Sequence, residues 1–152
     1  MLTIRDARRE DLQAIVALLA EDSLGGEAAP DDTAYARAFD AIAESPDNRL
    51  LVAEEAGRIV GTFQLTYIPN LSLIGGPRLQ IEAVRVASAR RGEGLGEAMM
   101  RWAIAYGRER GCVLVQLTTN AQRADARRFY ERVGFAPSHV GMKLPLDRSQ
   151  DL

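Results

Sequence analysis

Three glycines, Gly92, Gly94 and Gly96, alternate with larger residues between a strand-like run over 79–87 and a predicted helix over 95–110. Glycine permits positive φ angles and lets a ligand approach the backbone closely. The first amide groups of a helix lie at its positive end, where they bind anions. The turn therefore predicts a phosphate-binding site, and a tight strand-to-helix turn without a ligand is the alternative.

Two common phosphate-binding motifs do not fit this turn. The P-loop requires a lysine directly after its last glycine, and the only lysine of the chain is Lys143. The dinucleotide motif G-x-G-x-x-G would need glycine at Glu97 or at Met99. That motif also needs an acidic residue at the end of the next strand, and residues 113–120 contain none. P-loop binding of a nucleoside triphosphate is excluded, and NAD binding is disfavoured.

Hydrophobic periodicity predicts the order of the other elements. The predicted order is a strand at 2–6, helices at 10–21 and from 31–33 to 45, strands at 50–54, 59–68 and 79–87, a helix at 95–110, a strand at 112–119, a helix at 122–133, and one or two short closing strands after 135. Consecutive strands with short connections pair antiparallel, whereas a strand–helix–strand crossover makes its two strands parallel. The fold class is therefore mixed α/β (α+β). We expect a mostly antiparallel central sheet, with its fourth and fifth strands parallel and about four helices around it.

Composition limits the class of protein. The 152 residues are 47% hydrophobic and carry 19 basic and 21 acidic residues, which predicts one domain over 1–147 with a short tail at 148–152. The single cysteine, Cys112, excludes an internal disulfide, and no window approaches the ~20 apolar residues of a membrane span. Because the amino terminus lacks the apolar core of a signal peptide, we expect a cytoplasmic protein without a membrane partner. The single histidine, His139, excludes a histidine cluster, so no metal is expected.

The charge is unevenly distributed along the chain. Residues 85–134 contain ten arginines and five acids, whereas the residues before 56 contain thirteen acids and five arginines. The basic half lacks the interleaved aromatic residues of a nucleic-acid surface, so no nucleic-acid partner is expected. It suits an anionic ligand, and the acidic half suits a cationic one; scattered surface charge would give the same counts.

Two motifs indicate a family. Arg91, Gly94 and Gly96 form the pattern R-x-x-G-x-G, and residues 129–135 read F-Y-E-R-V-G-F. In this respect the chain resembles the GNAT family of N-acetyltransferases, whose signatures are Q/R-x-x-G-x-G/A after the fourth strand and a later F-Y-x-x-x-G-F. The resemblance covers nearly the whole chain, because the predicted element order is also that of the family. Ser88 is a departure, since family members often carry proline there.

The resemblance implies acetyl-CoA as co-substrate. The pantetheine amides would bind the fourth-strand backbone at Val84, Arg85 and Val86, and Phe129 and Asn120 would contact the cofactor. Asn120 serves equally well as a helix cap. The diphosphate would meet the turn formed by Arg91, Gly92, Glu93, Gly94, Leu95 and Gly96.

The resemblance and the chemistry together nominate two catalytic residues. A lysine-like amine has a pKa of about 10.4, so its deprotonation at pH 7 costs about 4.6 kcal/mol and calls for a base or a desolvating pocket. Glu82 is the only carboxylate between Glu55 and Glu93, and we expect it to act as general base through a water; the alternative is an exposed strand residue. The family places a tyrosine near the sulfur of CoA, which makes Tyr130 the general acid; the alternative is a core aromatic.

These features predict an N-acetyltransferase that transfers acetyl from acetyl-CoA to a primary amine by direct attack in a ternary complex. A catalytically silent acyl-CoA-binding sensor of the same fold is the alternative. The acceptor would be a small-molecule or peptide amine, and the sequence does not name it. The apolar connection 69–78 is interpreted as part of the acceptor site or as a homodimer contact, with packing over the core as the alternative.

Overall fold

The computed structural model describes residues 1–21 and 32–147. The chain forms two compact units, Met1–Leu117 and the remainder from Thr118, and each unit is described by itself. The expected tail at 148–152 and residue 31, at the expected start of the second helix, lie outside the described residues. None of the helices in the described ranges is long and apolar enough to cross a membrane.

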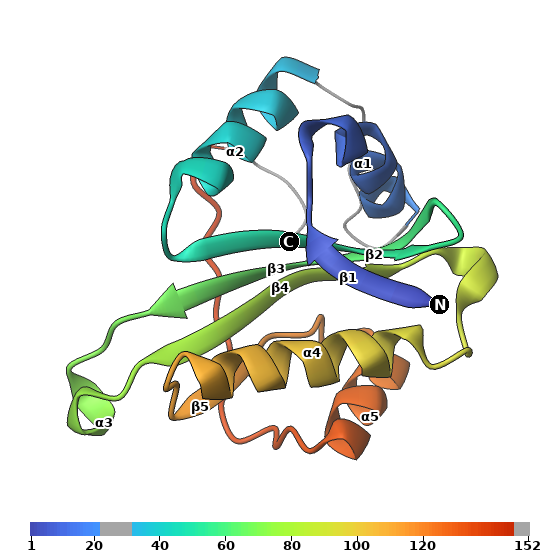
Figure 1. Ribbon diagram of the computed structural model, residues 1–152. Helices are drawn as coiled ribbons and strands as arrows, with labels where there is room; N and C mark the ends of the chain where they lie inside the picture. Colours follow the sequence, from blue (N-terminus) through green and yellow to red (C-terminus); the bar gives the residue numbers. More distant parts are fainter. Residues whose placement is uncertain (22–31, 148–152) are drawn as a thin grey trace. The chain divides into compact units, whose positions relative to one another are not determined.

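The first unit contains a five-stranded sheet in chain order (Figure 1). Its strands are β1 (Leu2–Asp6), β2 (Asn48–Glu55), β3 (Arg58–Ile68), β4 (Arg78–Val86) and β5 (Leu114–Leu117). The pairs β1–β2, β2–β3 and β3–β4 are antiparallel, and β4–β5 is parallel. The predicted fold class and the parallel pair are confirmed.

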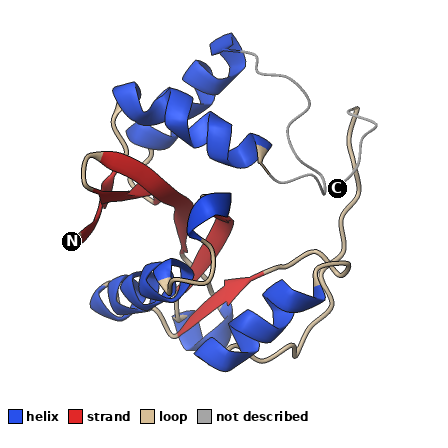
Figure 2. Ribbon diagram, turned by 90° about the vertical axis from the view of Figure 1, so that its right-hand side faces the viewer, coloured by secondary structure: helices blue, strands red, loops and turns tan. Residues whose placement is uncertain are grey.

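Helices cover both faces of this sheet (Figures 1 and 2). The helix α1 (Leu12–Ala20) contacts β3 and β4, and α2 (Asp32–Glu44) contacts β2 on the same face. On the other face lies α4 (Leu95–Glu109), where Trp102 meets the fully buried Phe63 edge-on with ring centroids 6.1 Å apart. The core between these layers is mostly apolar. Its largest buried hydrophobic side chains are Leu51, Val52, Phe63, Leu65, Leu79, Ile81, Met99 and Met100.

A nearly buried ion pair joins the first strand to the start of α1. Both carboxylate oxygens of Asp11 accept hydrogen bonds from the Arg5 guanidinium, at 2.7 and 3.1 Å, and Arg5 also reaches Glu54 at 3.1 Å. The Arg8 backbone N–H donates a further bond of 2.7 Å to Asp11. The Arg5 hydrogen bonds lower the pKa of Asp11, so this carboxylate stays charged at neutral pH and holds β1, β2 and α1 together.

The connection between β3 and β4 exposes aliphatic side chains. Its single helical turn, α3 (Ser72–Gly75), places Leu73 and Ile74 at positive φ, 57° each. The exposed fractions are 96% for Leu71 and 104% for Ile74, and Leu73 is also exposed. These three side chains therefore do not pack over the core, while the acceptor and homodimer roles stay predictions.

The second unit contains one helix, α5 (Ala124–Val133), among its described residues. Tyr130 lies between two aromatic rings of its own unit, with centroid distances of 5.1 Å to Phe129 and 6.0 Å to Phe135. Residues 136–147 form no strand, which differs from the predicted closing strands. Their apolar alternation is real, but Val140 and Met142 are 87% and 89% exposed. Alternation alone does not make a strand, because a strand also needs a neighbour for its backbone hydrogen bonds.

Candidate functional site

A β-bulge interrupts β4 at the predicted site. Gln64 of β3 pairs with Glu82 and Thr62 pairs with Arg85, so the one residue between them on β3 faces two residues on β4. Ala83, one of these two, has φ of 53°, which is rare for a residue with a side chain. The bulge therefore shifts the alternation of β4 by one residue.

The bulge brings Glu82 and Arg85 to the same face of the sheet, although residues three apart on a regular strand lie on opposite faces. Phe63 points to α4, so its neighbours Thr62 and Gln64, with their partners on β4, lie on the opposite face. Glu82 is exposed there, and Arg85 is half-buried and donates a 3.0 Å bond to the Val84 carbonyl.

The pairing between β4 and β5 ends early. It runs from Arg78 opposite Leu114 to Ile81 opposite Leu117, and β4 continues for five further residues. In the described part of the chain, no strand pairs with 82–86 on the β5 side. That edge can hydrogen-bond an extended ligand in the manner of an added strand. The predicted pantetheine-binding residues Val84, Arg85 and Val86 lie on it.

The glycine turn has the conformation that the sequence predicts. Gly92 and Gly94 have φ of 82° and 83°, and a Cβ atom at either position would meet nothing within 4 Å. Glycine is therefore required here by the backbone conformation and not by packing against the protein. The turn leaves open space beside its backbone, as a close-approaching ligand requires.

In the described part of the chain, the first-turn amides of the helix that follows donate to no backbone acceptor. Gly94 is the N-cap of α4 and supplies no side-chain cap, and the Ala98 N–H donates to the Gly94 carbonyl at 3.1 Å. The amides of Leu95, Gly96 and Glu97 precede this first helical bond. They lie at the positive end of a 15-residue helix, and this arrangement suits an anion.

Distant parts of the first unit anchor this turn. The Ser88 N–H donates to Glu21 Oε1 at 2.9 Å, and Arg90 Nη2 donates to Glu55 Oε1 at 2.6 Å. Arg90 Nε also donates to Glu93 Oε1 at 2.8 Å. Sequence analysis missed Glu21, Glu55 and Arg90, because no local pattern relates side chains that lie 35 or 67 residues apart along the chain.

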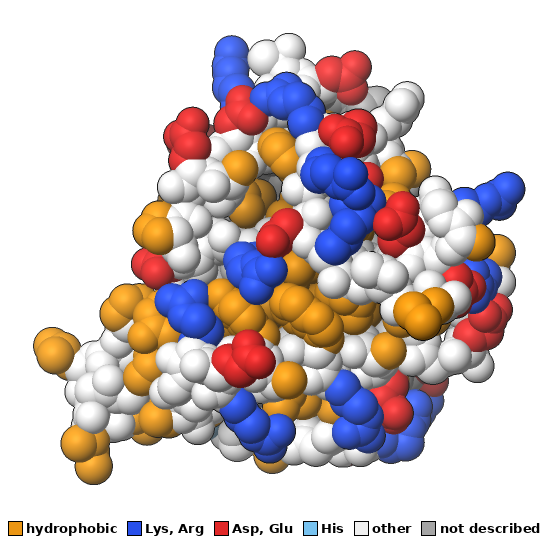
Figure 3. Space-filling view, viewed as in Figure 1, with side chains coloured by type: hydrophobic (Ala, Val, Ile, Leu, Met, Phe, Trp, Pro, Cys, Tyr) orange, Lys and Arg blue, Asp and Glu red, His pale blue; other side chains and the backbone are white. Residues whose placement is uncertain are grey.

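Many acids before residue 56 are already paired with arginines. Acidic and basic side chains are interspersed on the face in Figure 3. Among the described residues the pairs are Asp6–Arg49, Glu10–Arg8, Asp11–Arg5, Asp40–Arg9, Glu54–Arg5 and Glu55–Arg90. The acidic excess therefore gives less support to a cationic acceptor than the count alone suggested.

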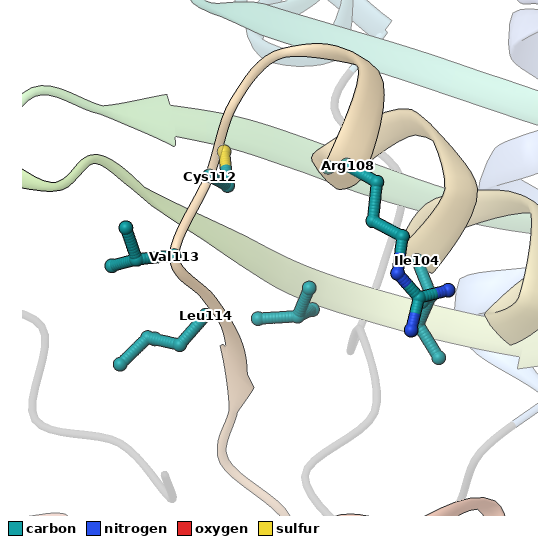
Figure 4. A pocket seen from close by; sticks show the side chains of 7 residues that line it. Ile104, Arg108, Cys112, Val113 and Leu114 are labelled. Carbon is teal, nitrogen blue, oxygen red and sulfur yellow. The ribbon is translucent and has the colours of Figure 1, made fainter.

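A pocket of about 210 Å³ lies elsewhere in the first unit, between α4 and the start of β5 (Figure 4). None of the predicted site residues lines it. Cys112 is part of its wall, and burial raises the pKa of this thiol, which suits a structural role. Among the described residues no cluster of three or more His, Cys, Asp or Glu side chains could hold a metal ion. The lining residues are Ile104, Gly107, Arg108, Cys112, Val113, Leu114 and Val115.

The remaining predicted residues belong to the second unit. Asn120 Oδ1 accepts a 2.9 Å bond from the Gln122 N–H, which agrees with a local capping role before α5. Phe129 and Tyr130 are half-buried on the predicted apolar face of α5. His139 is exposed, with its Nδ1 2.7 Å from the Ser138 hydroxyl.

Comparison with known proteins decides the family. The profile of the acetyltransferase (GNAT) family matches residues 12–135, which include both sequence motifs. The chain belongs to this family. It is therefore an acetyltransferase, as the sequence predicted.

Individual relatives agree with this assignment. Aminoalkylphosphonate N-acetyltransferase of Salmonella typhimurium is 32% identical over 139 residues, covering 90% of this chain and 86% of that protein. Glucosamine 6-phosphate N-acetyltransferase 1 of Oryza sativa is 30% identical, covering 74% of this chain and 68% of that protein. The crystal structure of a transcriptional regulator from Bacillus halodurans C-125 is 45% identical, has a TM-score of 0.92, and covers 96% of this chain and all of that one.

Alanine substitutions at two glycines with similar backbone angles test whether the turn binds an anion. Gly94→Ala and Gly57→Ala each place a side chain at φ near 80° in open space, so each should cost about 1–2 kcal/mol of stability. Only Gly94→Ala puts a methyl group at the start of α4, and it should weaken coenzyme A binding roughly tenfold or more. Calorimetric titration measures this effect. Equal affinities of the two variants would show that the turn is only structural.

Proposed function

We propose that this chain transfers acetyl from acetyl-CoA to a primary amine, by direct attack of the amine on the thioester in a ternary complex. The observation that carries the proposal is that β4 residues 82–86, which pair with no described strand on the β5 side, lead directly into the glycine turn and the first turn of α4. A ligand with an amide-bearing arm and a diphosphate matches that order of features. Family membership supplies the reaction.

The cofactor roles follow from this arrangement. Backbone groups of Val84, Arg85 and Val86 bind the pantetheine amides, and the amides from Gly92 to Gly96 bind the diphosphate. The Arg91 N–H already donates to the Ser88 carbonyl at 3.5 Å, so Arg91 binds the diphosphate through its side chain. Phe129 and Asn120 are proposed as further cofactor contacts on the strength of the family motif. A single domain over 1–147 and a cytoplasmic location stay predictions from the sequence.

The chemistry requires a proton acceptor and a proton donor. Attack of the amine gives a tetrahedral oxyanion, which collapses to an amide and the CoA thiolate. Glu82, exposed next to the bulge, removes the amine proton through a water. Tyr130 donates a proton to the departing thiolate. A β4 backbone N–H beside the bulge stabilises the oxyanion.

The names of two relatives support a narrower class of acceptor amine. The Salmonella typhimurium enzyme is named for aminoalkylphosphonates and the Oryza sativa enzyme for glucosamine 6-phosphate. Both acceptors are small primary amines that carry a phosphonate or phosphate group. The pairing of acids with arginines before residue 56 also gives no preference for a polycation. We therefore place this chain's acceptor in the class of small amines that carry a phosphorus oxyanion.

A panel of paired amines tests this function. Release of free thiol from acetyl-CoA is measured with aminoethylphosphonate against ethylamine, with glucosamine 6-phosphate against glucosamine, and with spermidine and a lysine peptide. We expect amine-dependent release, with the phosphorus-bearing member of each pair at least tenfold better in kcat/KM, which corresponds to about 1.4 kcal/mol. Preference for spermidine or the peptide would contradict the acceptor class. Coenzyme A binding without release for any amine would favour the sensor.

Tyr130→Phe tests the general acid. The variant keeps the ring that packs between Phe129 and Phe135 but loses the phenol, so turnover should fall by about 10²–10⁴-fold while coenzyme A affinity stays nearly unchanged. Steady-state kinetics and a binding titration give the two numbers. Phe135→Leu, at the other ring that Tyr130 contacts, is the control for packing. Unaltered turnover in Tyr130→Phe would remove this residue from the mechanism.

Glu82→Gln tests the general base. The glutamine keeps the size and the exposed position of the side chain but cannot accept a proton, so the fall in rate at low pH should flatten. The measurement is kcat/KM against pH with the best amine of the panel. Gln64→Glu, a change at the β3 partner of Glu82, is the comparison variant for added charge. An unchanged profile in Glu82→Gln would place the base elsewhere.

A further inference from the structure

The anion-binding turn contains an acidic residue. Glu93 lies between Gly92 and Gly94, in the stretch whose amides are open to an anion. A free carboxylate there would repel a diphosphate and would compete with it for the same N–H donors. The turn therefore needs a way to neutralise Glu93.

Arg90 supplies that neutralisation. Its Nε donates to Glu93 Oε1 at 2.8 Å, and its Nη2 donates to Glu55 Oε1 at 2.6 Å. Because these two hydrogen bonds use different nitrogens of one planar guanidinium, Glu55 fixes the orientation in which Arg90 receives Glu93. The two acids also raise the pKa of Arg90, Glu55 more than Glu93, so the guanidinium stays charged.

The segment that carries Arg90 is itself held in place. It forms a 3-10 turn, Ser88–Arg90, directly before the glycine turn. The Ala87 N–H donates to the Val60 carbonyl at 2.9 Å, and the Ser88 N–H donates to the Glu21 carboxylate at the same distance. Arg90 therefore starts from a fixed backbone position when it binds Glu93.

The ion pair between Arg90 and Glu93 contributes little to folding stability. The side chains of Arg90 and Glu93 are 30% and 47% exposed, and exposed ion pairs contribute little to folding because solvent screens them. The charge balance matters more for an anionic ligand, because a diphosphate carries more than one negative charge and an unneutralised Glu93 carboxylate would repel each of them.

We infer that Arg90 is a positioning residue for the cofactor site: it binds the Glu93 carboxylate, so that the amides of residues 92–96 remain available to the diphosphate. This inference rests on the proposed function. It assigns Arg90 an indirect role, in which its charge cancels that of Glu93 and its contact with Glu55 sets the geometry.

A double-mutant cycle on coenzyme A affinity tests the inference. Calorimetric titration is performed on the wild type, Arg90→Gln, Glu93→Gln and the double variant. Arg90→Gln should weaken binding roughly 5- to 10-fold, because it releases the Glu93 charge. Glu93→Gln should bind within about twofold of the wild type or more tightly. The double variant should recover most of the wild-type affinity, since the charge within the turn is gone and the remaining Glu55 carboxylate belongs to β2.

Salt and matched variants separate this role from a structural one. The loss in Arg90→Gln should shrink at high salt, because the repulsion is electrostatic. Arg90→Lys keeps the charge and should bind within about threefold of the wild type. Arg127→Gln removes an arginine from another ion pair, with Glu131, and should have no effect. Glu55→Gln leaves the Arg90–Glu93 pair and should cost less than Arg90→Gln.

The outcomes are distinct. A wild type that does not bind coenzyme A would overturn the proposed function together with this inference. A wild type that binds, with a defect in Arg90→Gln that Glu93→Gln does not rescue, would overturn the inference alone and would indicate direct contact of Arg90 with the phosphates. Unchanged affinity in Arg90→Gln would also overturn it. Rescue in the double variant, with a salt-dependent defect in the single one, supports it.

Discussion

The backbone geometry of β4 determines the rest of the candidate site. The bulge at Ala83 shifts the alternation of the strand, and the pairing with β5 ends at Ile81, just before it. A polar backbone edge that is paired on one side only can bind an extended ligand, and a fully paired strand could not. The same shift places Glu82 and Arg85 on one face of the sheet. The proposed pantetheine site and the proposed base thus depend on one local irregularity.

The glycine turn complements this edge, because it presents donors where the strand ends and the helix begins. Its conformation depends on two positive φ angles, and its position depends on bonds to Glu21, Val60 and Glu55, which come from distant parts of the first unit. The core of the unit is mostly apolar, whereas the polar groups of the site come from the strand end and from the turn. This separation of the apolar core from the polar site residues explains how a small sheet can hold a precise anion site.

Much of this arrangement could be predicted from the sequence, because it is local. The periodicity of each segment predicts the strands and helices of the first unit, and the spacing of the glycines predicts the turn. The bulge also left a signal: the apolar residues of β4 change phase between Ile81 and Val84. The anchoring by Glu21, Glu55 and Arg90 could not be predicted, since it depends on tertiary contacts. The closing strands were predicted wrongly, because apolar alternation at residues 140–146 was read without a neighbouring strand to pair with.

The connection between β3 and β4 has a consequence for the evolution of this chain. Ile74 adopts the left-handed conformation, which disfavours a β-branched side chain by roughly 1–2 kcal/mol, and that side chain is fully exposed. Glycine or asparagine there would relieve the torsional penalty without opening a cavity. A substitution that removes this strain would therefore raise the stability of the fold, at a surface position before the start of β4, whereas the glycine turn follows its end. The added stability could offset later substitutions elsewhere that weaken the packing.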